Sequence, residues 1–495
     1  MSMRLEERLE PVLRVQFQTG RQVELQQVLE ARDRRAALQQ HFLARGGRPL
    51  ICFTMNIAGP VKNSLLIRQG FEQGLEALRQ TLRAAGFPVA EECVLSEDTG
   101  NEAFLSVEAE PLALKRLTCG LEDRGMAGRL YDMDVLIRTE EEPSGIRKIG
   151  REEVGLPERG CLLCGRPTRE CASRRIHSVE DLQKKTAELL SASLLEQAAR
   201  ETAEYAQRAL LYELAVTPKP GLVDRANNGS HEDMDFYTFL SSCAALRPYL
   251  ERCVLTGQET WDRPAPETFR RLRDPGKEAE RQMLRATGGV NTHKGAIFTM
   301  GILAGAAGRL SVRMLKEGGV KSLSDRMLQE CAAMTKGLTA SDFAGVTSEN
   351  AATAGQRFYA LYGITGVRGQ MEAGLPAVRD WGLPALRRHM AAGKGPDRAG
   401  AAALLSIIAH TDDTNLIHRS SRERQQECAR QAQRLLEEAP DQCPRRPDLD
   451  MLDTAWIREH LSPGGSADLL AACWFLYFLE TDEAGRKLQP ERTGV

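Results

Sequence analysis

Five segments in the second half of the chain gather acids, bases and histidines around glycine or proline. The first, residues 217–235 (TPKPGLVDRANNGSHEDMD), starts with a stiff Pro-Lys-Pro-Gly, because each proline restricts the backbone. Its side chains of interest are Lys219, Asp224, Arg225, His231 and Asp233. Carboxylates beside cations and a histidine can bind a metal–phosphate group and transfer protons. A solvated loop with helix-capping acids explains part of this pattern, but not the Pro-Lys-Pro-Gly.

The second segment, residues 288–295 (GGVNTHKG), precedes a strongly apolar run. Asn291 or Thr292 can cap a helix there, which leaves backbone N–H groups free to bind a phosphate. His293 and Lys294 add a titratable ring and a positive charge. A lone histidine at this place would be unremarkable, but four such residues in succession favour a binding site.

Three further segments complete the set. Residues 362–369 (YGITGVRG) surround Arg368 with glycines, residues 412–419 (DDTNLIHR) contain Asp413, and residues 462–468 (SPGGSAD) form a loop that leads into a helix. Each segment alone is consistent with an ordinary loop or helix cap. All five in one domain predict a pocket for a polyphosphate and a metal ion.

The first half of the chain contains a pair of acids in a strand-like run. Asp132 and Asp134 lie two residues apart within residues 129–137 (RLYDMDVLI), so their side chains point to the same face of a strand. Two carboxylates on one face form a platform for Mg²⁺ beside a phosphate. An edge strand with one solvent-exposed face gives the same pattern, so this alternative stays open.

A second candidate in this half is residues 56–63 (NIAGPVKN), between a strand-like run and a helical one. Glycine permits close backbone approach, N–H groups at a helix start attract anions, and Lys62 adds a positive charge. A tight strand-to-helix turn explains the segment equally well.

The third candidate is a set of potential metal ligands, Cys161, Cys164, Cys171 and His177. Three thiols and one imidazole within this short span can close a tetrahedral zinc site. The alternative is that the cysteines are ordinary buried thiols in an arginine-rich segment, where Arg175 and His177 contact a phosphate.

The elements that position these residues differ between the two halves. Helical spacing in residues 4–43, 63–85 and 111–124 alternates with strand-like runs in residues 49–57, 93–107 and 129–137. This order predicts an α/β or α+β domain with a mixed sheet. After residue 178 the pattern is helical, as in residues 294–310, 324–338, 401–410 and 466–480, and predicts an all-α domain. Residues 438–450, rich in proline and arginine, predict a surface connection.

Composition narrows the class of protein. The chain has 495 residues and a formal charge of −2, which argues against a polybasic nucleic-acid binder. No uninterrupted apolar run approaches the roughly 20 residues that cross a membrane, and the charged start is unlike a secretory signal. Twelve cysteines are too sparse for a disulfide scaffold. These features predict a cytoplasmic protein that binds neither nucleic acid nor membrane.

The motifs resemble two known families. The blocks FTMNIAGPVKNS, GRLYDMDVL and CLLCGRPTRECASRRIHS are similar to holo-citrate-lyase synthase, which attaches the prosthetic group of citrate lyase to its acyl carrier protein. The blocks TPKPGLVDRANNGSHEDMD, GGVNTHKGAIF, YGITGVRG, DDTNL and SPGGSADLLA resemble triphosphoribosyl-dephospho-CoA synthase. The resemblance implies a fusion with a transferase domain over residues 1–180 and a synthase domain over residues 190–495. Ala58 and Gln370 depart from the patterns of the two families.

The resemblance implies a reaction for each domain. In the synthase domain a ribose hydroxyl of dephospho-CoA displaces adenine from ATP, and the triphosphate stays on the product. Its phosphates would be bound by Lys219, Arg225, Asn291, Thr292, Lys294 and Arg368. Asp224, Asp233 and Asp413 are candidates for Mg²⁺ ligand or general base, and His231 or His293 for proton donor.

In the transferase domain the product would pass to a serine of the citrate lyase acyl carrier protein, with release of pyrophosphate. The resemblance makes this domain nucleotidyltransferase-like, with Mg²⁺ on Asp132 and Asp134 and phosphate contacts from Lys62, Arg175 and His177. Two alternatives stay open: the same chemistry for the carrier protein of malonate decarboxylase, and a binding protein in which a zinc knuckle is joined to a helical scaffold.

Overall fold

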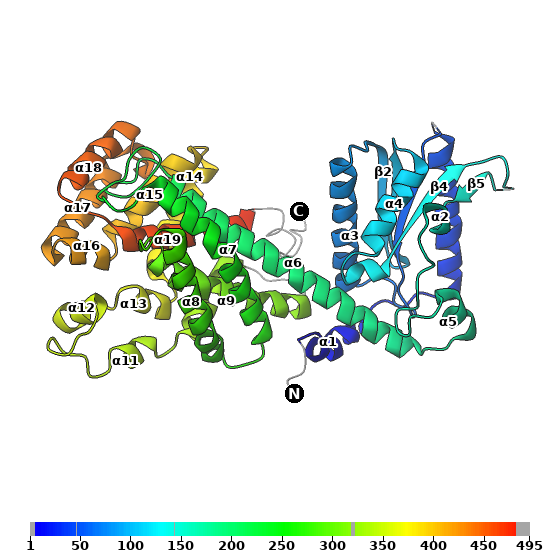
Figure 1. Ribbon diagram of the computed structural model, residues 1–495, viewed down its shortest axis with the longest axis horizontal. Helices are drawn as coiled ribbons and strands as arrows, with labels where there is room; N and C mark the ends of the chain where they lie inside the picture. Colours follow the sequence, from blue (N-terminus) through cyan, green and yellow to red (C-terminus); the bar gives the residue numbers. More distant parts are fainter. Residues whose placement is uncertain (1–4, 46, 143, 318–321, 482–495) are drawn as a thin grey trace. The chain divides into compact units, whose positions relative to one another are not determined.

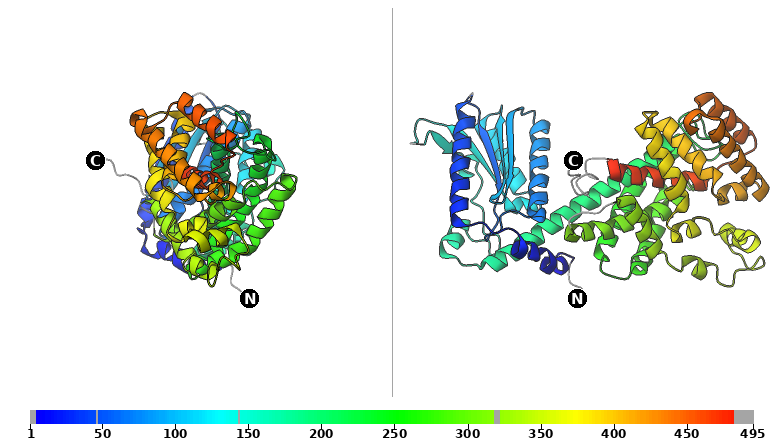
Figure 2. Two further views of the ribbon diagram at one scale, coloured as in Figure 1. Left: turned by 90° about the vertical axis from the view of Figure 1, so that its left-hand side faces the viewer. Right: turned by 180° about the vertical axis from the view of Figure 1, so that it is seen from behind.

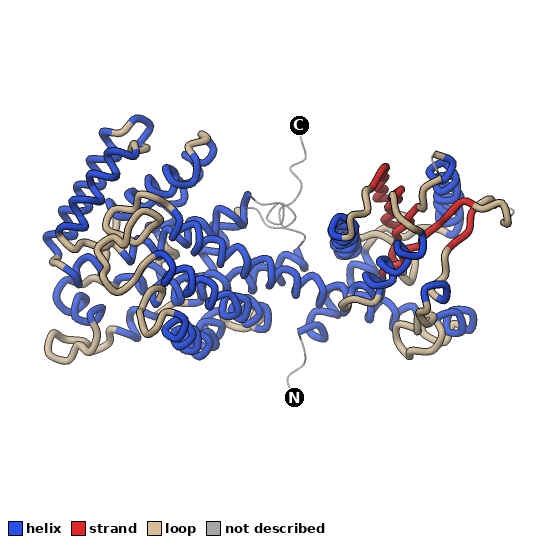
Figure 3. The backbone as a smooth tube through the Cα atoms, turned by 45° about the horizontal axis from the view of Figure 1, so that its top comes forward, coloured by secondary structure: helices blue, strands red, loops and turns tan. Residues whose placement is uncertain are grey.

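The computed structural model describes residues 5–45, 47–142, 144–317 and 322–481. It divides into two compact units, residues 1–197 and 198–495, and helix α6 (Val179–Ala215) runs through the boundary (Figure 1). Strands occur in the first unit, and the described regular elements of the second are helices (Figure 3).

A five-stranded sheet forms the centre of the first unit. Its strands are β1 (Leu50–Met55), β2 (Val89–Glu97), β3 (Gly100–Val107), β4 (Tyr131–Arg138) and β5 (Ile146–Lys148). Their order is β2-β3-β1-β4-β5 and every neighbouring pair is antiparallel. The prediction of a mixed sheet is therefore wrong. The helical crossovers do join parallel strands, β1 to β2 and β3 to β4, but each leaves a one-strand gap that an antiparallel strand fills, as in split β-α-β sheets.

Helices cover both faces of this sheet (Figure 2). Helix α2 (Leu25–Ala44) packs on one face, where Phe42 stacks on Phe104 with ring centroids 6.0 Å apart. Helix α3 (Leu65–Ala84) packs on the other, where Phe71 lies 4.7 Å from Phe53. The first unit also contains the helices α1 (Leu5–Thr19), α4 (Pro111–Glu122) and α5 (Thr168–Arg174), and short 3₁₀ turns at Ala127–Leu130 and Glu152–Val154. Alternation of apolar side chains in β1 thus serves two hydrophobic layers.

The second unit is largely helical, as predicted. Following α6, its helices are α7 (Phe236–Glu259), α8 (Ala265–Ala286), α9 (Lys294–Glu317), α10 (Leu323–Met334), α11 (Leu338–Asp342), α12 (Ala354–Tyr362), α13 (Gly366–Glu372), α14 (Leu383–Ala391), α15 (Gly395–Ala409), α16 (Thr414–Arg419), α17 (Arg422–Glu438), α18 (Arg446–Arg458) and α19 (Gly464–Thr481). A π-helical turn, Ala377–Gly382, precedes α14, and a 3₁₀ turn, Pro440–Gln442, precedes α18.

Residues 438–450 are more than the surface connection that their composition predicts. Arg446 begins α18, and Cys443 is fully buried. Proline explains the difference, because Pro447 stands in the first turn of α18, where a missing N–H is tolerated.

Helices α9 and α19 form the core of this unit. Among the described residues one helical stretch, Lys294–Lys316, is long and apolar enough to cross a membrane, but 89% of its most apolar window is buried inside the structure. Its one buried cation, Arg309, donates to Glu330, to the Thr260 carbonyl and to Thr268. Such complete pairing is what makes a buried charge tolerable.

Candidate functional site

The Pro-Lys-Pro-Gly loop of the second unit is held by two acids. The carboxylate of Asp224 accepts hydrogen bonds from the backbone N–H groups of Lys219 (2.9 Å), Ala226 (2.6 Å) and Asn227 (3.2 Å). Asp453 of α18 accepts from the Gly221 N–H (2.9 Å) and from the side chain of Asn227 (2.9 Å). Hydrogen bonds to these two carboxylates, one from the loop and one from α18, therefore hold the backbone of the loop in place.

Arg225 lies at the exposed rim of the same loop. Its guanidinium contacts Asp397 of α15 at 2.5 Å and the Thr217 hydroxyl at 3.2 Å. Asp397 also accepts from the Thr217 N–H, at 3.2 Å. Because about half of the Arg225 side chain is exposed, a bound anion could reach it.

Lys219 points the other way, into the unit. Its Nζ lies 2.5 Å from Oε1 of Glu213, near the end of α6, and both side chains are buried. Burial raises the pKa of Glu213, and the charge of Lys219 opposes the rise. The lysine predicted to bind phosphate is thus already paired with a buried carboxylate.

His293 is buried next to this pair. Its Nδ1 lies 2.7 Å from the Ser242 hydroxyl of α7, and the Thr292 hydroxyl donates to the same Ser242 oxygen at 2.9 Å. Burial, together with the charge of Lys219, lowers the pKa of His293 to about 3. His293 is therefore neutral near pH 7 and acts as a hydrogen-bonding group rather than as a cation.

Asp468 of α19 meets the N-terminal turn of α9. It accepts a hydrogen bond from the Ala296 N–H, and a Cβ built at Gly295 would lie 1.9 Å from its Oδ2. Burial, followed by the charges of Glu213 and Asp413, raises the pKa of Asp468 well above its ordinary value. The residue as a whole is only half-buried, but its carboxyl group is enclosed. Enclosure favours the protonated form of this carboxyl group.

Asp413 joins two helix starts. Its Oδ1 accepts from the N–H groups of Asn415 (2.9 Å) and Leu416 (3.2 Å), which makes it the cap of α16. Its Oδ2 accepts from the N–H (2.7 Å) and hydroxyl (2.8 Å) of Ser466 in α19. A Cβ at Gly366 would lie 3.2 Å from the Thr414 side chain, so the glycine-spaced loop adjoins this helix start too.

His231 lies at the outer side of these segments. Its Nε2 is 2.9 Å from the Ser462 hydroxyl, its Nδ1 is 3.1 Å from Nη2 of Arg419, and the exposed Asp233 is 4.0 Å away. Burial, followed by the charge of Arg419, lowers the pKa of His231 to about 4. The residue links the first, fourth and fifth segments in one place.

The structure thus brings together parts of all five segments, but not every predicted residue. Lys294 is largely exposed and contacts Glu280 of α8 at 3.4 Å. Arg368 contacts Asp342 at 2.6 Å, and Asn291 is exposed. Glu213, Arg419, Asp453 and Asp468 were not among the predicted site residues. One signal could have revealed Glu213, because it is a lone acid in the apolar run ALLYELAV.

In the first unit, Asp132 and Asp134 lie on the face of the sheet that α2 covers. The register pairs Thr54 with Asp132 and Cys52 with Asp134, and Lys148 of β5 forms an ion pair with Asp134. Burial, followed by repulsion from Asp134, raises the pKa of Asp132. A cation placed between the two carboxylates would relieve this repulsion.

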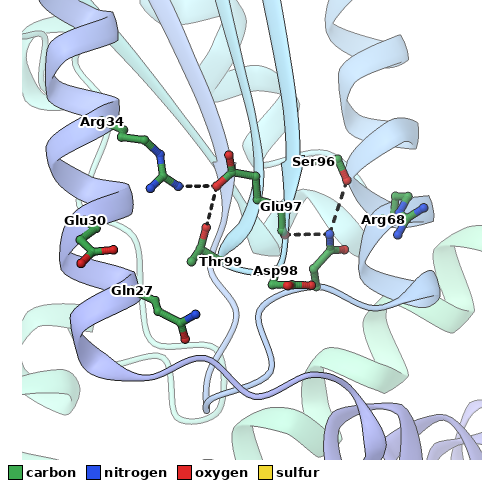
Figure 4. A pocket seen from close by; sticks show the side chains of 9 residues that line it. Gln27, Glu30, Arg34, Arg68, Ser96, Glu97, Asp98 and Thr99 are labelled. Atoms are coloured by element: carbon green, nitrogen blue, oxygen red, sulfur yellow. Dashed lines mark hydrogen bonds and ion pairs between the residues drawn. The ribbon is translucent and has the colours of Figure 1, made fainter.

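A pocket of about 470 Å³ opens at the end of the sheet where β2 turns into β3 (Figure 4). Its lining residues are Gln27, Glu30, Arg34, Asn63, Arg68, Ser96, Glu97, Asp98 and Thr99. Asn63 donates to the Glu97 carbonyl at 2.9 Å, and Arg34 forms an ion pair with Glu97. Of these residues only Asn63 belongs to a segment that sequence analysis selected.

Helix α2 connects this pocket to the acid pair. Arg35, which follows the pocket residue Arg34, donates to Glu102 of β3 at 2.8 Å. Burial opposes, but the bond to Glu102 raises the pKa of Arg35, with a smaller contribution from the charge of Asp132. Arg35 therefore lies within electrostatic reach of the acid pair and next to a pocket residue. Lys62 is turned inward instead, since its Nζ donates to the Ile57 carbonyl at 2.6 Å, and burial, followed by the charge of Arg32, lowers its pKa.

The four potential metal ligands also lie together. The ligand atoms of Cys161, Cys164, Cys171 and His177 are all within 4.8 Å of one another. Arg175 is exposed, with a positive φ of 47°, and does not belong to this group.

Comparison with known protein families follows the division into two units. Residues 23–193 match the model of apo-citrate lyase phosphoribosyl-dephospho-CoA transferase, and residues 199–487 match that of ATP:dephospho-CoA triphosphoribosyl transferase. The chain belongs to both families, as a fusion. The resemblance of the motifs is confirmed, and the two activities of the fusion are those of the citrate lyase prosthetic group pathway: synthesis of triphosphoribosyl-dephospho-CoA and its transfer to apo-citrate lyase.

Curated relatives have the same organisation. The chain is 33% identical to Protein CitXG of Haemophilus influenzae over 93% of its own length and 97% of the relative's. It is 30% identical to Protein CitXG of Leuconostoc mesenteroides over 93% of its length and 98% of the relative's. Its second unit is also similar to 2-(5''-triphosphoribosyl)-3'-dephosphocoenzyme-A synthase of Pectobacterium atrosepticum, with 40% identity over 55% of this chain and 87% of that protein. The fusion family therefore accounts for nearly the whole chain.

Proposed function

We propose that the synthase reaction takes place at the polar cluster made by Glu213, Lys219, His293 and Asp468, in the second unit. The observation that carries this proposal is convergence: two acids, a lysine and a histidine from segments far apart in sequence meet inside a unit whose core is otherwise apolar. Buried groups with displaced pKa values gather at functional sites more often than elsewhere.

As the ribose hydroxyl of dephospho-CoA forms its bond to C1′, the bond from C1′ to adenine breaks. Adenine takes a proton from an acid, and the proton lost by the hydroxyl restores that acid. A negative charge near the ribosyl centre is needed as well. Displacement at C1′ passes through a cationic, oxocarbenium-like state. Asp468 supplies the proton in our proposal, because burial raises its pKa and so favours its protonated form at the start of α9. Glu213, which Lys219 helps to keep ionised, stabilises the positive charge. Two carboxyl groups in different environments divide the roles of acid and anion in this way in other enzymes.

The histidines and the other predicted acids take positioning roles. His231 and His293 have lowered pKa values of about 4 and about 3, so near neutral pH both rings are neutral and neither is an imidazolium acid. The carboxylate oxygens of Asp224 and Asp413 already accept hydrogen bonds from backbone N–H groups of these segments. Their hydrogen bonds hold the segments in the arrangement that the reaction needs.

Arginines at the rim are placed to bind the triphosphate. Arg225 and Arg419 each keep contact with polar groups of the first segment and remain within reach of a bound anion. Arginine suits phosphate because its planar fork can form two parallel hydrogen bonds. The exposed carboxylate of Asp233 fits as a Mg²⁺ ligand here, whereas Asp413, with four hydrogen bonds accepted, does not.

For the first unit, we place transfer to the carrier protein between the acid pair of β4 and the pocket beside α2. Asp132 and Asp134 fit a Mg²⁺ ion, because they share a face and repel each other without a cation between them. Such an ion would neutralise charge on the phosphates. Arg34 and Arg68 in the pocket are the cations placed to hold the phosphates of the incoming group, and a serine of the acyl carrier protein is the acceptor.

The family of the first unit indicates which carrier protein accepts the prosthetic group. Its family model is that of the citrate lyase transferase, so we propose the citrate lyase acyl carrier protein rather than that of malonate decarboxylase. Both carrier proteins offered as acceptors to the same enzyme test this choice. Because the substrates are ATP and dephospho-CoA, we place the protein in the cytoplasm.

Two assays on one set of variants test the assignment. Asp468→Asn should reduce adenine release from ATP and dephospho-CoA by about 100-fold or more, as loss of a proton donor does in other enzymes. It should leave carrier labelling with supplied triphosphoribosyl-dephospho-CoA unchanged. Asp132→Asn with Asp134→Asn should do the opposite. The exposed Asp274→Asn and Glu141→Gln are matched controls. Normal adenine release by Asp468→Asn would remove Asp468 from the mechanism.

A further inference from the structure

The cluster of Cys161, Cys164, Cys171 and His177 has the dimensions of a metal site. Cys164 Sγ lies 3.3 Å from Cys171 Sγ and 3.2 Å from His177 Nε2, and all four ligand atoms are within 4.8 Å of one another. Bond lengths of about 2.3 Å to sulfur and 2.0 Å to nitrogen around tetrahedral zinc put the ligand atoms roughly 3.5–3.8 Å apart. The cluster needs only small side-chain adjustments to reach that spacing.

The backbone around the first two cysteines is already folded for this purpose. The N–H groups of Leu163 and Cys164 donate to the Cys161 sulfur, and the Gly165 N–H donates to the Cys161 carbonyl at 3.1 Å. Gly165 has a φ of 73°, a conformation that favours glycine. The turn therefore directs the side chains of Cys161 and Cys164 to the same side.

The second pair of ligands comes from a separate element. Helix α5 supplies Cys171, and the Ile176 N–H donates to the Cys171 carbonyl at 3.1 Å, which turns the chain so that His177 faces the thiols. Two independent local structures thus converge on one point. Thiols that met only by chance would not require these two separate local structures.

We propose that Cys161, Cys164, Cys171 and His177 bind one zinc ion with a structural role. Thiolate and imidazole are ligands that zinc prefers, and four protein ligands leave no open position for a substrate. In this proposal His177 binds the metal rather than a phosphate.

The metal site would stabilise the surroundings of the transfer site. Arg159, two residues before Cys161, donates to the Tyr131 carbonyl at 2.5 Å and to the Gly128 carbonyl at 2.9 Å. Arg129 donates back to the Gly160 carbonyl at 2.9 Å. These bonds fasten the cysteine loop to the start of β4, directly beside Asp132. Zinc would fix a loop that otherwise has little regular structure.

The metal would also fix the start of helix α6. Val179, two residues after His177, and Gln183 contact the position that a Cβ at Gly59 would occupy, at 3.0 and 2.4 Å. Gly59 belongs to the segment between β1 and α3, which contains the pocket residue Asn63. This segment is therefore connected to the zinc ligands, as the start of β4 is.

Metal analysis of the full-length protein, purified under reducing conditions, tests the proposal. We expect one zinc per chain, and we expect Co²⁺ to replace it with the intense absorption bands of a tetrahedral thiolate site. Cys164→Ser and His177→Ala should bind little or no zinc, whereas Cys93→Ser, a half-buried cysteine outside the cluster, should keep it. Cys164 is exposed, so serine is tolerated there.

Activity assays separate this proposal from the proposed function. Cys164→Ser should lower carrier labelling and leave adenine release unchanged, because the synthase site lies in the other unit. A wild-type protein that neither contains zinc nor binds added Zn²⁺ or Co²⁺ would overturn the proposal, whatever its activity. A Cys164–Cys171 disulfide that persists in protein purified under reducing conditions would overturn it as well. The wild-type metal titration decides the question even if a variant fails to fold.

Discussion

The carboxylate of Asp468 occupies the space that a side chain at Gly295 would fill, since a Cβ at that position would lie 1.9 Å from Oδ2. The two residues come from the second and fifth motif segments, 173 positions apart in the sequence. Their contact explains why the segment GGVNTHKG ends in glycine. It also brings Asp468 to the start of α9, where the Ala296 N–H donates a hydrogen bond to its carboxyl group.

This contact predicts the effect of Gly295→Ala. The added methyl group should displace the Asp468 carboxylate, and forced overpacking of this kind costs about 1–3 kcal/mol of unfolding free energy. Adenine release should fall by more than the loss of folded protein explains, while carrier labelling stays normal. Gly276→Ala is the control, because its nearest neighbour to an added Cβ lies at 3.7 Å. Normal adenine release by Gly295→Ala would contradict the proposed role of Asp468.

The buried pair of Glu213 and Lys219 predicts strongly coupled mutations. Lys219→Met leaves an unpaired carboxylate inside the unit, which costs about 3–5 kcal/mol of unfolding free energy. Glu213→Gln combined with Lys219→Met should recover much of that loss, because no buried charge then remains. Urea unfolding followed by tryptophan fluorescence measures this directly, since all four tryptophans lie in the second unit. Additive effects of the two substitutions would show that the pair does not form.

Activity of the same double variant tests whether Glu213 takes part in the reaction. If Glu213 and Lys219 form only a structural ion pair, the stabilised double variant should regain adenine release. We expect it to remain inactive, because our mechanism needs the ionised Glu213.

Burial of His293 predicts a dependence of stability on pH. Its folded pKa of about 3 lies below the unfolded value of about 6.5, so between these values only the unfolded state binds the proton. The unfolding free energy of the second unit should therefore lose about 1.4 kcal/mol per pH unit from this residue as the pH falls below 6.5. His293→Gln should remove that contribution. The exposed His418→Gln should retain it, and equal slopes in wild type and His293→Gln would refute the assignment.

The hydrogen bonds of Asp413 predict a structural loss on substitution. Asp413→Asn replaces one acceptor oxygen by an amide group facing the N–H and hydroxyl of Ser466. An unsatisfied buried group costs about 1–3 kcal/mol. We expect lower stability of the second unit and weak adenine release. The exposed neighbour Asp412→Asn is the matched control, and equal stability of the two variants would contradict this role.

Local patterns in the sequence determined much of this protein. The alternation of helical and strand-like runs predicted most of the elements of the first unit but not β5 or α5, and the helical runs predicted the helical second unit, because both depend on side-chain periodicity. The motif segments were also visible, since loops that hold charged groups need glycine and proline at defined places. The Cys-Cys-Cys-His set was recognisable from spacing alone.

Tertiary structure alone decided strand direction and the partners of each charge. The antiparallel sheet arises because β3 and β1 fill the gaps that the two crossovers leave, which periodicity does not record. Lys219 and Lys294 look alike in the sequence, yet packing buries the first against Glu213 and leaves the second exposed beside Glu280. Glu213 and Asp468 come close to each other because helices from distant parts of the chain end or begin at one place. Pairing and burial depend on contacts between such distant residues, so only the fold could assign them.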